Sequence, residues 1–177
     1  YNFKLGIARK LIFSKWQEAL GGEAKAIASG SAALQPRLCR IFLAAGIPIL
    51  EGYGLTETSP VISVNCFKNG IRIGTVGTLL EHVHVKFAAD GEILVKGPNL
   101  MMGYYNLPEK TAEEIDSDGW FHTGDIGEMV EGKFLKITDR KKEIFKTSGG
   151  KFVIPQVMEN KFKDETNLSK IYNYFIN

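Results

Sequence analysis

Three short polar clusters in this sequence could do chemistry on a phosphorylated ligand, because each follows an apolar segment. They are Ser29–Leu34 (SGSAAL), Gly52–Thr58 (GYGLTET) and Thr147–Gly150 (TSGG). Ligands of open α/β sheets bind beyond the carboxyl ends of strands, and glycines there let a flat group approach the backbone. Each cluster alone is equally explained as a structural turn, since left-handed backbone angles favour glycine.

The second cluster carries the most chemical content. Tyr53 could stack on an aromatic base, and Thr56 could donate a hydrogen bond to a phosphate oxygen. Glu57 could hold Mg²⁺ through one carboxylate, since hard cations prefer oxygen ligands. The alternative interpretation is a polar turn in which the threonine and the glutamate cap the segment that follows.

Two further acidic positions could bind a sugar. Asp125 ends the segment Trp120–Asp125 (WFHTGD), and Asp139 precedes Arg140. Aspartate can accept both hydroxyls of a ribose, and a guanidinium suits a ribose or a phosphate. On spacing alone, a surface ion-pair cluster is at least as good an explanation, and His122 is interpreted as a turn residue rather than a base.

The elements that must position these residues begin with a strand–helix–strand order. Apolar spacing predicts a helix over 3–20, a strand over 24–29, a helix over 35–45 and a strand over 47–50. Short connections between them favour a parallel α/β unit, which we place at about residues 1–60.

The following stretch, about 61–138, is rich in short strands and predicts a small antiparallel sheet or barrel. The expected elements are strands 61–64, 74–77, 82–87 and 92–96, a helix over 106–115, and a hairpin of 126–130 with 133–138. A charged junction at 139–142 leads to strands 143–146 and 152–154 and to a helix that Pro155 begins.

Composition excludes several classes of function. The net charge of +2, from 22 basic and 20 acidic residues, lacks the basic excess that is typical of nucleic-acid-binding proteins. Cys39 and Cys66 are not spaced like metal ligands, which favours a reduced, cytoplasmic chain. No apolar run approaches the length of a membrane span. The helix over 3–20 is basic and amphipathic; packing on a protein core is favoured, and peripheral contact with a membrane surface is the alternative.

Four stretches in order resemble the core motifs of the adenylate-forming superfamily, which includes acyl-CoA synthetases. They are Gly52–Glu57 (GYGLTE), Gly91–Tyr105 (GEILVKGPNLMMGYY), Trp120–Gly127 (WFHTGDIG) and Asp139–Val153 (DRKKEIFKTSGGKFV). Ser29–Leu34 and Ile154–Asn160 (IPQVMEN) are most similar to the AMP-forming long-chain fatty acid–CoA ligases.

This resemblance implies that a fatty acid carboxylate attacks the ATP α-phosphate, giving acyl-AMP, and that CoA then displaces AMP. It implies the end of the large AMP-binding domain over 1–138 and the hinge and beginning of the α+β lid over 139–177. Thr56 and Glu57 would be catalytic, Glu57 would bind Mg²⁺, and Asp139 would be the hinge. The residues implied to bind ATP, AMP or CoA are Gly30, Ser31, Ala32, Glu51, Gly52, Tyr53, Gly54, Asp125, Arg140, Lys146, Gly149, Gly150 and Lys151.

Departures from the family pattern limit what this chain is expected to do alone. No loop of the YTSGTTG kind is present to hold the outer phosphates, and the family's late lysine is not identifiable. We therefore expect a piece of a longer ligase, inactive by itself and prone to self-association. The alternatives are another adenylate-forming acid–CoA ligase, or a non-catalytic nucleotide-binding or interaction module of the same fold.

Overall fold

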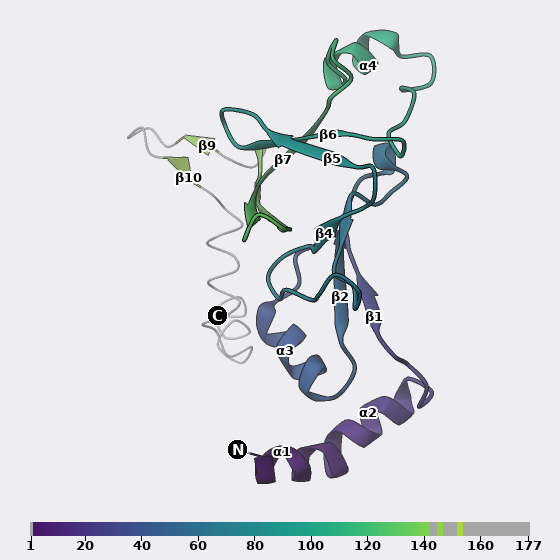
Figure 1. Ribbon diagram of the computed structural model, residues 1–177, viewed down its shortest axis with the longest axis vertical. Helices are drawn as coiled ribbons and strands as arrows, with labels where there is room; N and C mark the ends of the chain where they lie inside the picture. The colour runs from purple at the N-terminus through teal and green to yellow at the C-terminus, as the bar shows by residue number, and fades with distance from the viewer. Residues whose placement is uncertain (1, 142–144, 147–151, 154–177) are drawn as a thin grey trace, which may run out of the picture.

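The computed structural model describes residues 2–141, 145–146 and 152–153. A helical run at one end of the elongated molecule comprises α1 (Asn2–Ala8), the π-helical segment η1 (Arg9–Phe13) and α2 (Ser14–Ala19) (Figure 1). The predicted helix over 3–20 is therefore present but not uniformly α-helical. It ends at Gly21 and Gly22, whose φ angles of 84° and 77° no α-helix can accommodate.

The predicted parallel α/β unit is confirmed. Strand β1 (Ile27–Ser29) pairs in parallel with β2 (Ile49–Tyr53), and α3 (Pro36–Ala44) connects them. Strand β2 is displaced from the predicted 47–50 and continues to Tyr53, because β3 (Ser63–Val64) pairs antiparallel with its last two residues. The start of the glycine-rich cluster is therefore part of a sheet.

The first sheet is mixed, with the order β1-β2-β3-β4. The expected strand at 74–77 is wrong, since the pairing segment is β4 (Thr78–Leu79). Gly77 has a φ of 85°, and a side chain there would meet the backbone of Val64 and Asn65, so this segment is a turn. Apolar content alone does not show that such a turn precedes the strand.

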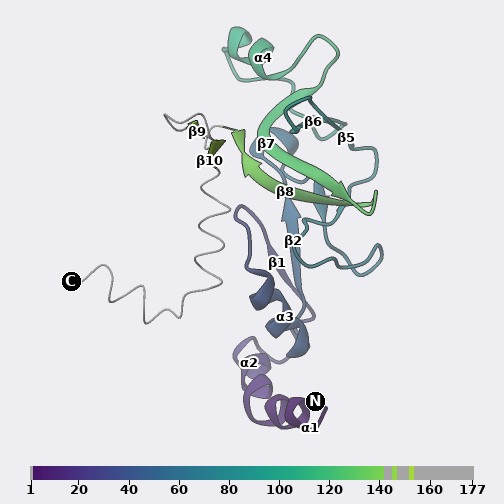
Figure 2. The same ribbon diagram turned by 90° about the vertical axis from the view of Figure 1, so that its left-hand side faces the viewer.

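The second sheet is antiparallel, with the order β5-β6-β7-β8. Its strands are β5 (His84–Phe87), β6 (Glu92–Lys96), β7 (Phe121–Val130) and β8 (Phe134–Arg140), and α4 (Pro108–Glu114) lies between β6 and β7 in the chain. Strands β7 and β8 extend beyond the predicted hairpin (Figure 2). A separate antiparallel pair is formed by β9 (Phe145–Lys146) and β10 (Phe152–Val153).

The buried core lies where the two sheets meet. It consists of Ile62, Val83, Ile93, Val95 and Leu135, all at most 6% exposed. Backbone hydrogen bonds also join the sheets, since Leu135 accepts from Val76 and donates to the Gly77 carbonyl, both at 2.8 Å. This junction sets the end of β2 beside β7 and β8. Within the described residues, no helix is long and apolar enough to cross a membrane.

Candidate functional site

The first two polar clusters lie side by side because β1 and β2 are parallel and in register. Ser29 is opposite Glu51, and a Cβ added to Gly30 would lie 3.4 Å from the Gly52 carbonyl oxygen. Ser31, with a φ of 67°, and Ala32 follow as exposed residues. The carboxyl ends of neighbouring parallel strands are where α/β sheets bind ligands.

A tight turn follows β2 and requires a glycine. A Cβ on Gly54 would lie 1.7 Å from the Pro60 carbonyl oxygen, so no side chain fits there. The buried Thr58 hydroxyl closes the turn, because it accepts the Leu55 amide N–H at 3.0 Å and lies 3.1 Å from the Pro60 oxygen. Thr56 is left exposed on the short helix η2 (Thr56–Thr58).

Glu57 is held at both its backbone and its side chain by the segment that follows β6. The Tyr104 hydroxyl donates to Glu57 Oε1 at 2.8 Å, and the Met101 amide donates to the Glu57 carbonyl at 2.8 Å. Desolvation, with the Glu57 carboxylate next in importance, raises the pKa of Tyr104 to about 12, so its hydroxyl remains a donor at neutral pH.

The described residues contain no group of three potential metal ligands. A single partly buried carboxylate at Glu57 nevertheless fits Mg²⁺, which is commonly held by one or two carboxylates together with substrate phosphates and water. A bound magnesium ion there would neutralise phosphate charge.

Tyr53, Asp125 and Arg140 converge from three different strands. The Tyr53 hydroxyl donates to Asp125 Oδ2 at 2.6 Å, and Arg140 Nε lies 3.3 Å from Asp125 Oδ1. Asp125 is 5% exposed, whereas the Arg140 side chain is 60% exposed. Burial first, and the Asp125 charge second, raise the pKa of Tyr53 far above its ordinary value. A carboxylate oxygen has more than one lone pair, so each Asp125 oxygen can accept a further hydrogen bond.

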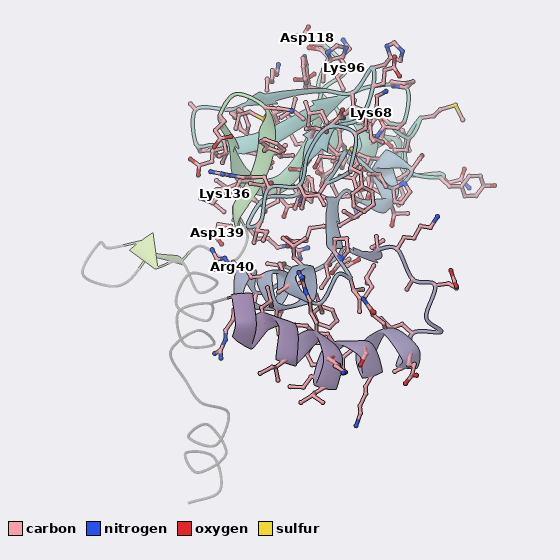
Figure 3. All side chains as sticks on the ribbon, turned by 60° about the horizontal axis from the view of Figure 1, so that its bottom comes forward. Arg40, Lys68, Lys96, Asp118, Lys136 and Asp139 are labelled. Atoms are coloured by element: carbon pink, nitrogen blue, oxygen red, sulfur yellow. The ribbon has the colours of Figure 1, made fainter. Side chains whose placement is uncertain are left out.

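Two irregularities in strand pairing place Asp125 and Arg140. Three residues of β7, Thr123–Asp125, face a single residue of β6, and a second register shift follows Ile126 in the pairing with β8. Bulges re-aim side chains and are common beside active sites. Asp139, the expected hinge residue, lies within β8 and is 2% exposed, with its carboxylate accepting the Arg140 amide at 2.7 Å. Figure 3 labels Asp139 at the edge of the second sheet.

Glu51, the central residue of β2, is a buried carboxylate. The Cys39 thiol donates to Glu51 Oε2 at 3.5 Å. Desolvation raises the pKa of Glu51 and is also the largest cause that raises the pKa of Cys39 to about 11. Both groups therefore favour their neutral forms more than they do in water.

The remaining predicted ligand contacts fall at or beyond β9. Lys146 lies in β9, and Gly149, Gly150 and Lys151 lie outside the described residues. An open hollow of about 570 Å³ lies elsewhere, against α4, and of the residues that contact the site only Tyr104 lines it. Sequence reasoning gave no role to Thr58, Glu92 or Tyr104; membership of the Gly91–Tyr105 motif was the available signal for the last two.

Comparison with known proteins matches residues 6–105 to the family described as AMP-binding enzyme. A long-chain-fatty-acid–CoA ligase of Mycobacterium bovis is 42% identical over 94% of this chain and 28% of its own length. Human long-chain-fatty-acid–CoA ligase 6 is 38% identical over 92% of this chain and 25% of its own length. The chain thus spans about a quarter of the length of these curated relatives.

Solved structures of related enzymes are similar to this chain in both fold and sequence. ATP-bound MatB from Rhodopseudomonas palustris has a TM-score of 0.71 and 36% identity, covering 79% of this chain and 30% of that chain. The O-succinylbenzoate coenzyme A synthetase of Bacillus subtilis, in complex with ATP and magnesium ion, has a TM-score of 0.64 and 27% identity, covering 79% and 33%. With the family match over more than half of its residues, this chain belongs to the AMP-binding enzymes.

Proposed function

We propose that this chain is part of a long-chain fatty acid–CoA ligase, which activates a fatty acid with ATP to acyl-AMP and transfers the acyl group to CoA. The observation that carries the proposal is the contact of Tyr53, Asp125 and Arg140, which joins three separate motifs into one polar cluster. Similarity to long-chain ligases from a bacterium and from human supports the choice of acid.

In this proposal the nucleoside binds where β2, β7 and β8 meet. Tyr53 stacks on the adenine, and Asp125 and Arg140 hold the ribose hydroxyls. Gly30, Ser31 and Ala32 line the junction of the adenine and acyl sites. Glu51 and Gly52 lie near the edge of the adenine, and Gly54 also binds the nucleotide. The adjacency of the β1 and β2 loop ends supports this assignment.

The phosphate side uses the turn after β2. Thr56 contacts the α-phosphate and Glu57 holds magnesium, as its single carboxylate and the exposed hydroxyl beside it allow. The ligase works mainly by orienting carboxylate and phosphate and by stabilising the charge that develops between them.

The remaining assignments concern CoA and the lid. We propose that residues 1–138 end the large domain and that 139–177 begin the lid, with Asp139 as hinge. Gly149 and Gly150 then border the pantetheine route, and Lys146 and Lys151 contact ligand in one of the two lid positions. A cytoplasmic enzyme with peripheral membrane contact fits the acyl substrate.

The isolated chain is proposed to be inactive and to self-associate. Its exposed apolar side chains include Ile7, Leu11 and Ile12 on the helical run, at 45–60% exposure, and β1 is the edge strand of its sheet. Exposed apolar patches and open sheet edges are sites of association. In a complete ligase the missing polypeptide would cover them.

The test is ATP–pyrophosphate exchange by the complete ligase that contains this chain. Palmitate is expected to support exchange, and the isolated 177-residue chain is expected to show none. Exchange with O-succinylbenzoate or a short acid, but not with palmitate, would replace the long-chain assignment by another acid–CoA ligase. Absence of exchange with every acid would favour a non-catalytic module.

A further inference from the structure

The pairing of β6 with β7 leaves a backbone gap beside Asp125. Glu92 is opposite Ile126 and Leu94 is opposite His122, so Thr123–Asp125 face Ile93 alone. The register therefore skips Gly124, and buried N–H groups without a ladder partner need another acceptor. Gly124 also has a φ of 70°, an angle that glycine adopts without strain.

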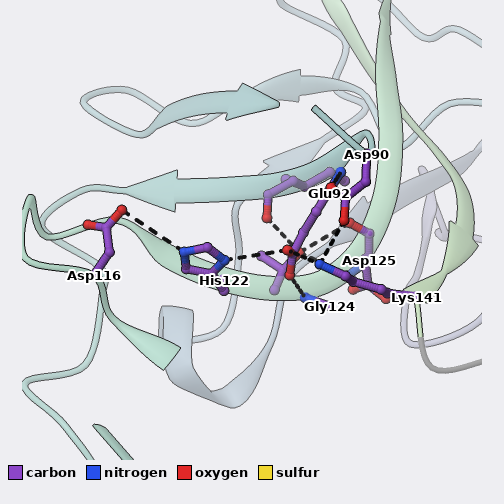
Figure 4. A network of polar contacts seen from close by, with 9 residues as sticks. Asp90, Glu92, Asp116, His122, Gly124, Asp125 and Lys141 are labelled. Atoms are coloured by element: carbon purple, nitrogen blue, oxygen red, sulfur yellow. Dashed lines mark hydrogen bonds and ion pairs between the residues drawn. The ribbon is translucent and has the colours of Figure 1, made fainter. Parts of the chain in front are cut away.

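Side chains replace the missing ladder bonds. Glu92 Oε1 accepts the Gly124 amide at 2.9 Å (Figure 4). The Thr123 hydroxyl donates to the Ile93 carbonyl at 2.8 Å and accepts the Asp125 amide at 3.1 Å. The backbone from Thr123 to Asp125 is thus fixed by Glu92 and Ile93 of β6, directly or through the Thr123 hydroxyl.

The second oxygen of Glu92 reaches Lys141, the residue that follows Arg140. Glu92 Oε2 lies 2.9 Å from Lys141 Nζ and 3.4 Å from His122 Nδ1, and Lys141 also lies 2.8 Å from Asp90 (Figure 4). Lys141 immediately follows Arg140 in the chain. One carboxylate therefore connects the residue before Asp125 to the residue after Arg140.

Glu92 is 4% exposed, so its charge needs compensation. Burial by itself raises the pKa of Glu92, but the hydrogen bonds from Lys141, Gly124 and His122 together outweigh burial and lower it. Hydrogen bonds to Asp90 first and to Glu92 second raise the pKa of Lys141 above its usual range. Both partners are charged at neutral pH, and the bridge between β6, β7 and β8 is an ionic one.

We propose that Glu92 is a positioning residue for the nucleotide sugar. It fixes Asp125 through the Gly124 amide and Arg140 through the Lys141 ammonium. It does not itself contact the nucleotide. The inference rests on the proposed function, because it assigns the ribose to Asp125 and Arg140. Its specific consequence is that discrimination between a ribose and a sugar without hydroxyls depends on Glu92.

The experiment compares ATP with 2′,3′-dideoxy-ATP in palmitate-dependent pyrophosphate exchange by the complete ligase. The wild-type KM ratio, dideoxy-ATP over ATP, is expected to be about 10 to 100, the range for hydrogen bonds to a charged group. Glu92→Gln is expected to reduce this ratio to below about 3 by raising the KM for ATP, with dideoxy-ATP little affected.

Glu128→Gln is the matched control, since Glu128 lies on β7 but forms an exposed pair with Lys136 at 2.8 Å. It should leave the ratio at the wild-type value. Lys141→Met changes an exposed residue and serves if Glu92→Gln fails to fold; it should lower the ratio by about 3-fold or more, since it releases a charged contact.

A purely structural role would lower activity with both nucleotides equally. An unchanged ratio in folded Glu92→Gln, or in Lys141→Met where the first variant does not fold, overturns the inference while the ligase assignment stands. If the wild-type enzyme shows no palmitate-dependent exchange, the proposed function is overturned, and the inference with it.

Discussion

The second sheet and the N-terminal helical run differ in how completely they bury their own side chains. In the sheet, Ile93, Val95 and Leu135 are each 0% exposed. In the helical run, Leu11 is 60% exposed and the described part of α1–α2 contains no buried residue. Figure 3 shows side chains projecting from the helical run on the side turned away from the sheets. The sheet buries its apolar side chains against other described residues, whereas the helical run leaves several of its own exposed.

The two tryptophans allow this contrast to be measured, because one lies in each region. Trp16 is on α2, with its ring centroid 5.5 Å from that of Phe42 on α3. Trp120 precedes β7, and Lys86 Nζ lies 4.3 Å from its ring centroid. Fluorescence of Trp16→Phe and Trp120→Phe backgrounds therefore follows each region separately.

The largest expected effect is on the sheet core. Leu135→Ala should lower the free energy of unfolding seen by Trp120 by about 2 to 5 kcal/mol, because the cavity cannot be filled. Leu11→Ala should change it by less than about 0.5 kcal/mol. Urea unfolding of the chain provides the measurement, and similar losses for the two variants would break the comparison.

The next effect concerns nucleotide binding. Asp125→Asn in the complete ligase should weaken ATP binding on the order of 10- to 100-fold, since a buried charge facing Tyr53 and Arg140 is removed. Calorimetric titration measures it. Glu18→Gln on α2 is the control and should have no effect; a comparable loss there would show that the helical run contributes to the site.

Two buried carboxyls give pH effects of opposite sign. The lowered pKa of Glu92 means that its stabilisation is present above the unfolded pKa, near 4.5, and is lost as pH falls through the folded value. The raised pKa of Glu51 means that its contribution is present at low pH and is lost as pH rises through the folded value.

At pH 7, Glu92→Gln should therefore destabilise the Trp120 transition, by about 1 to 3 kcal/mol, and Glu51→Gln should stabilise the Trp16 transition. Both differences should shrink as the pH is lowered through the respective folded-state pKa values. Unfolding in urea across pH 3–8 checks this, and changes of the same sign at pH 7 would contradict the assigned environments.

The smallest effect on stability is expected for exposed apolar residues of the helical run, where a substitution should mainly change self-association. Leu11→Ser should leave the Trp120 transition within about 0.5 kcal/mol of wild type, because the side chain is exposed. It should nevertheless reduce self-association of the isolated chain in sedimentation velocity. Lys10→Ser on the same run controls for the loss of a long side chain, and a monomeric wild-type chain would refute the proposal.

The sequence predicted which residues form the candidate site better than it predicted the contacts that hold them in place. Period and turn signals located β6 at 92–96 and the parallel pair β1–β2, and motif order brought Tyr53, Asp125 and Arg140 together as hypotheses. The bulge at Thr123–Asp125 was not predicted, because register is set by cross-strand pairing and leaves no local pattern. Glu92, at the start of an otherwise apolar strand, likewise gave no sign that its charge would be compensated by Lys141.

The bulge in β7 also constrains how the length of this strand can vary. It adds two residues, an even number, so His122 and Ile126 remain opposite Leu94 and Glu92 on the same side of the sheet. Deleting one residue at this point, without a bulge to absorb the change, would reverse the inward and outward faces of the residues that follow. Length changes in β7 at this point should accordingly come in steps of two, or be accompanied by a new single-residue bulge such as the one at Thr138 in β8.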